Sequence, residues 1–152
     1  MNLERPVFVD TNILLYARDT HYSAKRAVAQ NWVQFLARRQ LGRLSAQVLL
    51  EFYSAATDGA KLGIVANEAR SDVEALAHWD PVPSDLALWR TAWRLADSHS
   101  LSWRDSMIMA AAVGARCGTP LSEDLQDGLV VDGTLTVMNP FAPQAPPPPD
   151  GP

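Results

Sequence analysis

Short apolar runs that end in acidic residues, separated by longer segments of helical spacing, are the feature that most constrains the fold of this chain. Residues 7–9 form a β-branched and aromatic run that ends at Asp10, and residues 120–122 form a second run, followed by Glu123 and Asp124. Runs of this kind are typical of buried strands. Short strands alternating with longer helices predict an α/β fold, a three-layer α/β/α sandwich with a central, mainly parallel sheet.

The segments between these runs carry apolar side chains at helical spacing. We therefore expect helices over residues 21–40, 46–57, 65–78, 85–97 and 103–116. Ser45 and Ser102 precede two of these segments and suit the N-cap position, because a serine hydroxyl accepts a hydrogen bond from the first helical turn. We also expect short strands over residues 43–44 and 135–138, and an extended edge or loop over residues 79–83, which contain two prolines.

Length and composition are those of one folded domain. With 152 residues, 47% of them hydrophobic, the chain is long and apolar enough to bury one core. We expect that core in a domain spanning residues 1–142. Proline dominates the remaining segment, residues 143–152, for which we expect a disordered tail.

The cellular compartment is predicted from cysteine usage and from the first residues. Cys117 is the only cysteine and can form no disulfide within the chain, which suits a reducing cytoplasm. The N-terminal residues lack the basic and apolar regions of a secretion signal, and the uncharged run 107–115 is shorter than the ~20 residues that cross a bilayer. We expect a cytoplasmic protein with no membrane partner.

The formal net charge of −4 argues only weakly against a nucleic-acid partner. Acids that bind a metal ion no longer contribute to the negative net charge, and two basic stretches can form a local positive rim. They comprise Lys25, Arg26, Arg38, Arg39 and Arg43, and then Arg90, Arg94 and Arg104. Taken singly, each of these residues is interpreted as part of a solvated helix face.

Four carboxylates can meet at one edge of the predicted sheet. Asp10 and Asp124 follow strands, whereas Glu51 and Asp105 lie in the first two turns of predicted helices. At an effective dielectric constant of ~20, two unit charges ~4 Å apart repel by about 4 kcal/mol, so such a cluster must take up protons or bind a cation. Ligands that are all oxygen atoms favour Mg²⁺ or Mn²⁺. The three histidines are scattered, without an acidic or cysteine partner at ligand spacing, so no zinc site is predicted.

Each acid also has a purely structural interpretation. Asp10 suits a helix cap, Asp105 suits the positive end of a helix dipole, and Asp124 suits a turn. Glu51 is more informative because Val48, Leu49, Leu50, Phe52 and Tyr53 surround it in the sequence. A buried acid among apolar residues needs a polar partner.

Several segments occur in an order found in one protein family. They are Phe8-Val9-Asp10-Thr11-Asn12, residues 45–53 around Glu51, residues 102–108 around Asp105, residues 121–126 around Asp124, and Asn139-Pro140-Phe141. Together they resemble the PIN-domain nucleases and, among these, the VapC-type toxins of type II toxin–antitoxin systems. The resemblance covers residues 6–142, and its specificity comes from four motifs in the family's order.

This resemblance implies a site and an activity. The implied metal-binding and catalytic acids are Asp10, Glu51, Asp105 and Asp124, with Asn12 and Ser122 as polar helpers near the metal or the phosphate. The implied activity is RNA cleavage at a Mg²⁺- or Mn²⁺-dependent site, as the toxin that arrests translation. The implied partners are RNA, a second copy of the chain in a homodimer, and a cognate antitoxin whose tail occupies the site.

Two positions depart from the family pattern. Asp127 stands where relatives often carry histidine, and Trp103-Arg104 replaces a more apolar pair before Asp105. Neither departure removes a metal ligand. We interpret Arg104 as a solvated or salt-bridged residue, with phosphate binding as the alternative.

A second function stays open from the sequence. It is a PIN-like module that binds RNA or a protein partner with little or no nuclease activity, although the presence of all four acids favours the nuclease. Trp79, Trp89 and Trp93 could stack on RNA bases, but their helical spacing favours packing in the core or in a dimer.

Overall fold

The computed structural model describes residues 3–149, in which short strands alternate with helices. The elements in chain order are β1 (Val7–Val9), α1 (Thr11–Tyr16), α2 (Ser23–Arg39), β2 (Gly42–Arg43), α3 (Ala46–Thr57), α4 (Ala66–Leu76), the 3-10 helix η1 (Ala77–Trp79), α5 (Leu86–His99), α6 (Trp103–Gly114), β3 (Thr119–Leu121), β4 (Val130–Val131) and β5 (Leu135–Thr136).

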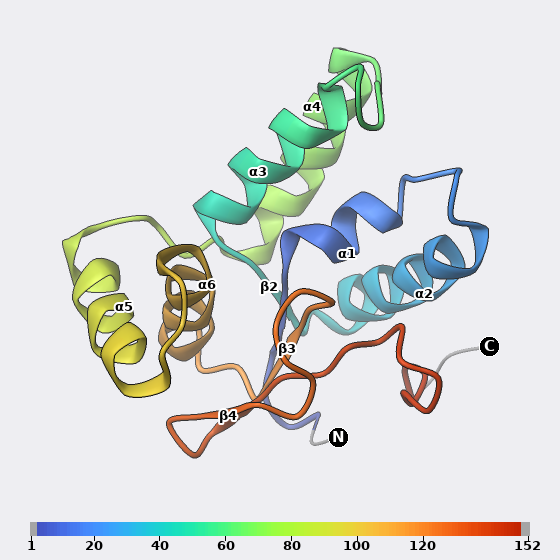
Figure 1. The fold of residues 1–152 in the computed structure, drawn as a ribbon. Helices are drawn as coiled ribbons and strands as arrows, with labels where there is room; N and C mark the ends of the chain where they lie inside the picture. The colour runs from blue at the N-terminus through green and yellow to red at the C-terminus, as the bar shows by residue number, and fades with distance from the viewer. Residues whose placement is uncertain (1–2, 150–152) are drawn as a thin grey trace.

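The central sheet has three parallel strands in the order β2-β1-β3. In its register Val7 lies between Gly42 and Thr119, and the three residues of β1 are completely buried. Figure 1 shows α1 and α2 on one side of the sheet and α5 and α6 on the other. The predicted α/β/α sandwich with a parallel sheet is therefore confirmed.

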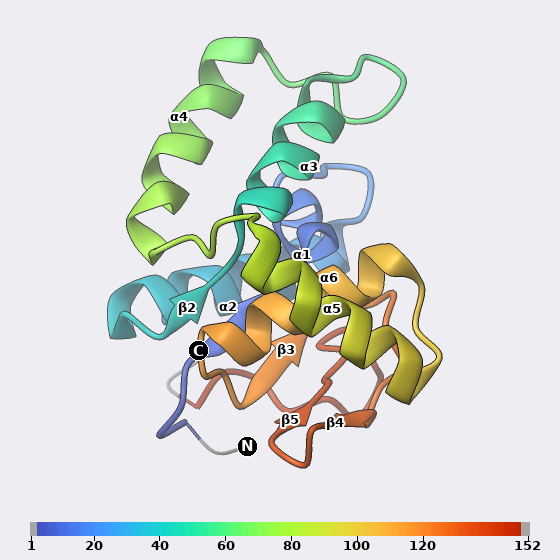
Figure 2. The same ribbon diagram turned by 90° about the vertical axis from the view of Figure 1, so that its left-hand side faces the viewer.

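Parallel strands bring their carboxyl ends to one edge of the sheet, and this edge organises the rest of the molecule. Asp10 joins β1 to α1, residues 44–45 join β2 to α3, and Ser122 follows β3. Helices α3 and α4 form a pair that extends away from this edge (Figures 1 and 2). Because α1 also packs against α3, side chains from several elements face one another there.

The core is continuous through both helical layers. Trp32 and Phe35 of α2 are completely buried and pack edge to face, with ring centroids 5.9 Å apart. Ile108 and Met109 of α6 are buried on the opposite side of the sheet. Cys117 is buried too, and its burial raises the pKa of the thiol to about 12, so this residue acts as a small apolar side chain.

Several element boundaries differ from the predictions. Helix α1 was not predicted, since six residues are too few to show a helical period. The predicted strand 135–138 pairs only over Leu135–Thr136, with a strand β4 that was not predicted, and Met138 forms an isolated bridge to Leu121. The predicted extended edge or loop over residues 79–83 is wrong at its start, because Trp79 ends η1 and Asp80 has a left-handed backbone, whereas Val82 forms an isolated bridge to Ser45.

Seven residues of the proline-rich tail belong to the described part of the chain. Within residues 143–149, the backbone N–H of Ala145 donates to the carbonyl of Ala142, and Pro148 is buried. Residues 150–152, which the prediction of a disordered tail also covers, lie outside the described residues. Disorder in the tail stays a prediction.

Within the described chain, none of the helices combines the length and apolar character needed to span a bilayer.

A substitution at Gly42 tests how tightly η1 packs on the sheet. A Cβ atom at this position would lie 2.5 Å from the ring of Trp79, so either the ring or strand β2 would have to move. We expect Gly42→Ala to lower the free energy of unfolding by about 1–3 kcal/mol, the usual cost of overpacking. Urea denaturation followed by tryptophan fluorescence measures this change.

Gly59→Ala is the matched control, because a Cβ atom there meets nothing within 4 Å. We expect this control to change stability by no more than about 0.5 kcal/mol. Equal stabilities for the two variants would contradict the packing described for Trp79.

Candidate functional site

Helix N-termini position three of the four predicted acids. Asp10 is the N-cap of α1, and its Oδ1 accepts a hydrogen bond of 2.7 Å from the backbone N–H of Thr11. Glu51 lies in the second turn of α3, which Ser45 caps, and Asp105 lies in the first turn of α6, which Ser102 caps. The predicted serine caps and the cap interpretation of Asp10 are confirmed.

Asp10 lies at the centre of the cluster and is completely buried. Its Oδ2 accepts hydrogen bonds from Ser122 Oγ at 2.7 Å and from Asn12 Nδ2 at 3.3 Å. The same Asn12 Nδ2 donates to Asp124 Oδ2 at 3.1 Å, and Ser122 Oγ accepts from the backbone N–H of Asp124. Asn12 and Ser122 therefore connect Asp10 to Asp124.

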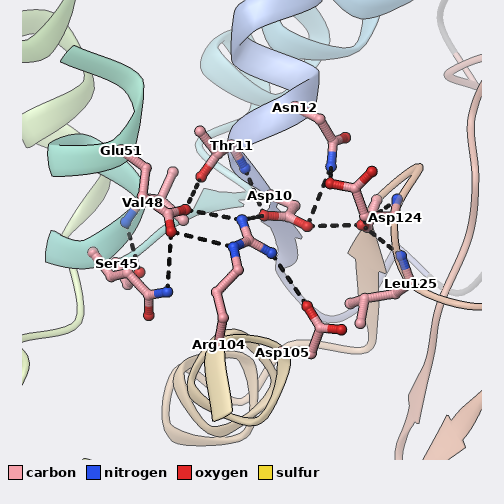
Figure 3. A network of polar contacts seen from close by, with 12 residues as sticks. Asp10, Thr11, Asn12, Ser45, Val48, Glu51, Arg104, Asp105, Asp124 and Leu125 are labelled. Carbon is pink, nitrogen blue, oxygen red and sulfur yellow. Dashed lines mark hydrogen bonds and ion pairs between the residues drawn. The ribbon is translucent and has the colours of Figure 1, made fainter. Parts of the chain in front are cut away.

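Glu51 faces the opposite side of the same cluster (Figure 3). Its Oε1 accepts from Thr11 Oγ1 at 2.7 Å, and its Oε2 accepts from Gln47 Nε2 at 3.4 Å. Burial by itself raises the pKa of Glu51, but hydrogen bonds from Arg104 and Thr11 outweigh burial and lower it. A lowered pKa means that these contacts stabilise the fold above the pKa of the unfolded chain and lose this effect as the pH falls through the folded pKa.

Arg104 occupies the space between the acids. Its Nη2 lies 2.9 Å from Asp10 Oδ1 and 2.8 Å from Glu51 Oε1, its Nε lies 3.2 Å from Glu51 Oε2, and its Nη1 lies 3.3 Å from Asp105 Oδ1. Figure 3 shows the guanidinium rising from α6 between Glu51 and Asp105. The interpretation of Arg104 as a salt-bridged residue is confirmed.

The structure thus brings together all six residues predicted for the site. Asp10, Glu51 and Asp105 surround one guanidinium, whereas Asp124 joins through Asn12 and Ser122.

Two residues that contact Glu51 were not predicted, Thr11 and Gln47. The position of Gln47 four residues before Glu51, on one face of a helix, could have indicated its contact.

A second polar group, also not predicted, fixes the loop that carries Asp124. Lys25 Nζ lies 2.6 Å from Glu123 Oε2, and Tyr16 donates its hydroxyl proton to Glu123 Oε1 at 2.8 Å. The hydrogen bond with Glu123 raises the pKa of Lys25. The sequence predicts Lys25, taken singly, on a solvated helix face, but in the structure Lys25 is ion-paired.

The histidines lie outside the cluster. His21 has an acidic neighbour, with its Nδ1 3.0 Å from Asp19 Oδ1, so the prediction that no histidine has an acidic partner was wrong in this detail. The His21 side chain is largely exposed, and no further acid joins the pair among the contacts of the described chain.

An open pocket exposes one side of the cluster to solvent. Thr11, Asn12, Glu51, Arg104 and Asp124 line it, together with Lys61 and Leu50. A second pocket shares Asn12, Lys61 and Asp124 with the first and continues past Tyr16, His21 and Tyr22. Because these residues are shared, the two pockets form one groove beside the acids.

The donor chemistry of the cluster fits a hard divalent cation. Four carboxylates against the one guanidinium of Arg104 leave a net charge of −3 among these five side chains. The present arrangement is that of acids around an arginine, and residues 3–149 contain no three His, Cys, Asp or Glu side chains placed to hold one metal ion. Oxygen ligands and negative charge therefore fit a hard divalent cation, whereas the present placement of the side chains does not.

Comparison with known families agrees with this arrangement. A family model described as the PIN domain matches residues 7–119. The chain belongs to the PIN-domain family. The match includes Asp10, Glu51 and Asp105, and Asp124 follows five residues after its end. PIN domains are generally nucleases. No curated protein sequence matches the chain significantly.

Two solved structures share the fold of this PIN domain. A chain of a toxin–antitoxin complex from Klebsiella pneumoniae aligns with a TM-score of 0.62 and 17% identity, covering 89% of this chain and 98% of that one. A chain of FitAcB from Neisseria gonorrhoeae aligns with a TM-score of 0.64 and 18% identity, covering 90% of this chain and 99% of that one. Identities this low establish the common fold alone.

Ser122 offers a test of the hydrogen bonds that hold the cluster. Ser122→Ala removes a donor from the buried Asp10 carboxylate and an acceptor from the backbone N–H groups of Asp124 and Leu125. We expect a loss of about 1–3 kcal/mol in the free energy of unfolding, measured by urea denaturation. Ser71→Ala, at an exposed position of α4, is the control and should change stability little. Equal losses of unfolding free energy in the two variants would mean that the hydrogen bonds of Ser122 do not stabilise the fold.

Proposed function

We propose that this PIN domain is a metal-dependent endoribonuclease and the toxin of a toxin–antitoxin pair. The single observation that carries the proposal is the gathering of Asp10, Glu51, Asp105 and Asp124 at one edge of the sheet. Purely structural roles explain each acid separately but not the net negative charge that they build up together beside an open pocket.

The proposed cofactor is Mg²⁺ or Mn²⁺, held by these four carboxylates. When bound, such an ion would polarise a phosphoryl oxygen and activate water for hydrolysis of a phosphodiester bond. The role of the chain is to keep the ligands in place. Ser122 and Asn12 fix the carboxylate of Asp10, and Thr11 and Gln47 fix that of Glu51.

The proposed RNA site is the groove beside the acids. Lys61 lines both of its pockets, and Arg104 lines the first, so both cations are placed to attract phosphates. Tyr16, Tyr22 and His21 line the second pocket, where aromatic rings can stack on unpaired bases. A groove lined by cations and aromatic rings next to the carboxylates suits a single-stranded or looped RNA.

The proposed partners and compartment rest on three further observations. The similar structure from Klebsiella pneumoniae is a toxin–antitoxin complex, which supports a cognate antitoxin as the partner of this chain. The lone buried Cys117 supports the cytoplasm as its compartment. A homodimer is supported by apolar side chains exposed along α5 and at the start of α6, namely Leu86, Trp89, Trp93 and Trp103.

Asparagine variants of the acids test the nuclease directly. We expect the purified chain to cleave a structured RNA with single-stranded loops in Mn²⁺ and to stop in EDTA. Asp10→Asn and Asp124→Asn should each lower the cleavage rate at least about 100-fold, since even outer-shell partners of catalytic metals cost 10–100-fold. Gel analysis of end-labelled RNA measures the rates.

Asp97→Asn, on the exposed face of α5, is the matched control and should retain the cleavage rate of the natural chain. Cleavage that persists in Asp10→Asn would point to a contaminating nuclease or to another site. RNA binding without cleavage, together with a melting temperature that Mn²⁺ leaves unchanged, would favour the alternative function of a binding module.

The proposed homodimer surface is tested by placing a charge on it. Trp93 is half exposed and stacks on Trp103, with ring centroids 6.3 Å apart. We expect Trp93→Lys to halve the molar mass measured by light scattering, because a charge is costly in an apolar interface. Ala87→Lys, exposed on the same helix outside the stripe, should stay dimeric. A natural chain that is monomeric at every concentration would contradict the proposed dimer.

A further inference from the structure

The ion pairs of Arg104 with the acids are the feature of the site that the proposed function leaves unexplained. Arg104 lies in the first turn of α6, next to Asp105, yet its side chain turns into the cluster and contacts three of the four acids. The contact with Glu51 is bidentate, through Nε and Nη2, which is the strongest geometry for an arginine and a carboxylate.

These contacts occupy four carboxylate oxygens on three of the four acids proposed to hold the metal ion. The guanidinium binds Oδ1 of Asp10, both carboxylate oxygens of Glu51, and Oδ1 of Asp105. A divalent cation placed among the same atoms would repel the guanidinium strongly at such short range. Metal and guanidinium therefore compete for one set of ligands.

Two properties of Arg104 allow this competition, its positive charge and its partial exposure to solvent. An arginine guanidinium stays charged in proteins, and here it forms ion pairs with Asp10, Glu51 and Asp105. About a third of the side chain is exposed, at 35%, and it lines the open pocket. The guanidinium can therefore move toward solvent without unfolding α6.

We propose that Arg104 is the resident cation of the metal-free cluster, and that a divalent metal ion binds by displacing its guanidinium from Asp10 and Glu51. This inference rests on the proposed metal-dependent function and adds a residue that sets the metal affinity. Without metal, Arg104 offsets part of the repulsion among the acids and keeps them together. With metal, it leaves, and the cost of breaking its ion pairs weakens metal binding.

The test is a calorimetric titration of the metal-stripped full-length chain with MnCl₂, comparing the natural protein with Arg104→Gln and Arg104→Lys. Arg104→Gln should bind Mn²⁺ at least about tenfold more tightly, because no charge-assisted hydrogen bonds have to break. Arg104→Lys should lie between the two, since a lysine keeps the charge but not the bidentate contact. Metal-free Arg104→Gln should melt at a lower temperature and recover this loss in Mn²⁺.

The matched control is Arg94→Gln, which breaks another bidentate pair, that of Arg94 with Asp132 at 3.0 and 2.9 Å. Its Mn²⁺ affinity should equal that of the natural chain. Unchanged or weaker Mn²⁺ binding by Arg104→Gln would overturn the competition while leaving the proposed metal site intact. Failure of both the natural chain and Arg104→Gln to bind Mn²⁺ would overturn both proposals.

A measurement on the natural chain covers the case in which Arg104→Gln does not fold. The ¹⁵N–¹H signal of the Arg104 Nε group, assigned by its loss in Arg104→Lys, reports the hydrogen bond to Glu51. Titration with MgCl₂ should move this signal toward the position of a solvated arginine, with the same midpoint as a calorimetric titration of the natural chain with MgCl₂. A signal that stays in place while Mg²⁺ binds would overturn the proposal.

Discussion

Burial of the Asp10 carboxylate is the constraint on which the rest of the site depends. A completely buried acid must be compensated where it lies, because an unpaired charge in the interior is very costly. Asp10 is compensated by the N-terminus of α1, by Ser122 and Asn12, and by the guanidinium of Arg104. These partners come from α1, from the residue that follows β3, and from α6, so satisfying one carboxylate requires the sheet and both helical layers to be assembled.

The fold explains why acids far apart in the sequence meet. Parallel strands end at one edge, and α3 and α6 begin near that edge with capped N-termini, whose positive dipole ends favour carboxylates. Hydrogen bonds then connect the acids on both sides of Asp10, with Asp124 on one side and Glu51 on the other. The cluster is therefore a product of topology as much as of the individual residues.

Sequence reasoning predicted those parts of the structure that a local pattern encodes. The strand before Asp10, the serine caps of α3 and α6, and the presence of Glu51 in an apolar helix could all be read from neighbouring residues. Helix α1 is too short to show periodicity, and β4 with β5 forms only two paired positions. The position of Arg104 inside the cluster depends on packing between α1, α3 and α6, which no spacing in the sequence specifies. From the sequence, a salt bridge of Arg104 was one possible interpretation, but its acidic partners could not be named.

The most direct test of the central claim, that these carboxylates form a site for a divalent cation, is anomalous X-ray diffraction from crystals soaked in MnCl₂. We expect an anomalous peak within coordination distance, ~2.0–2.6 Å, of oxygen atoms of at least two of Asp10, Glu51, Asp105 and Asp124, with the guanidinium of Arg104 moved away. A peak elsewhere on the surface, with Arg104 still bound to Asp10 and Glu51 at saturating Mn²⁺, would contradict this claim.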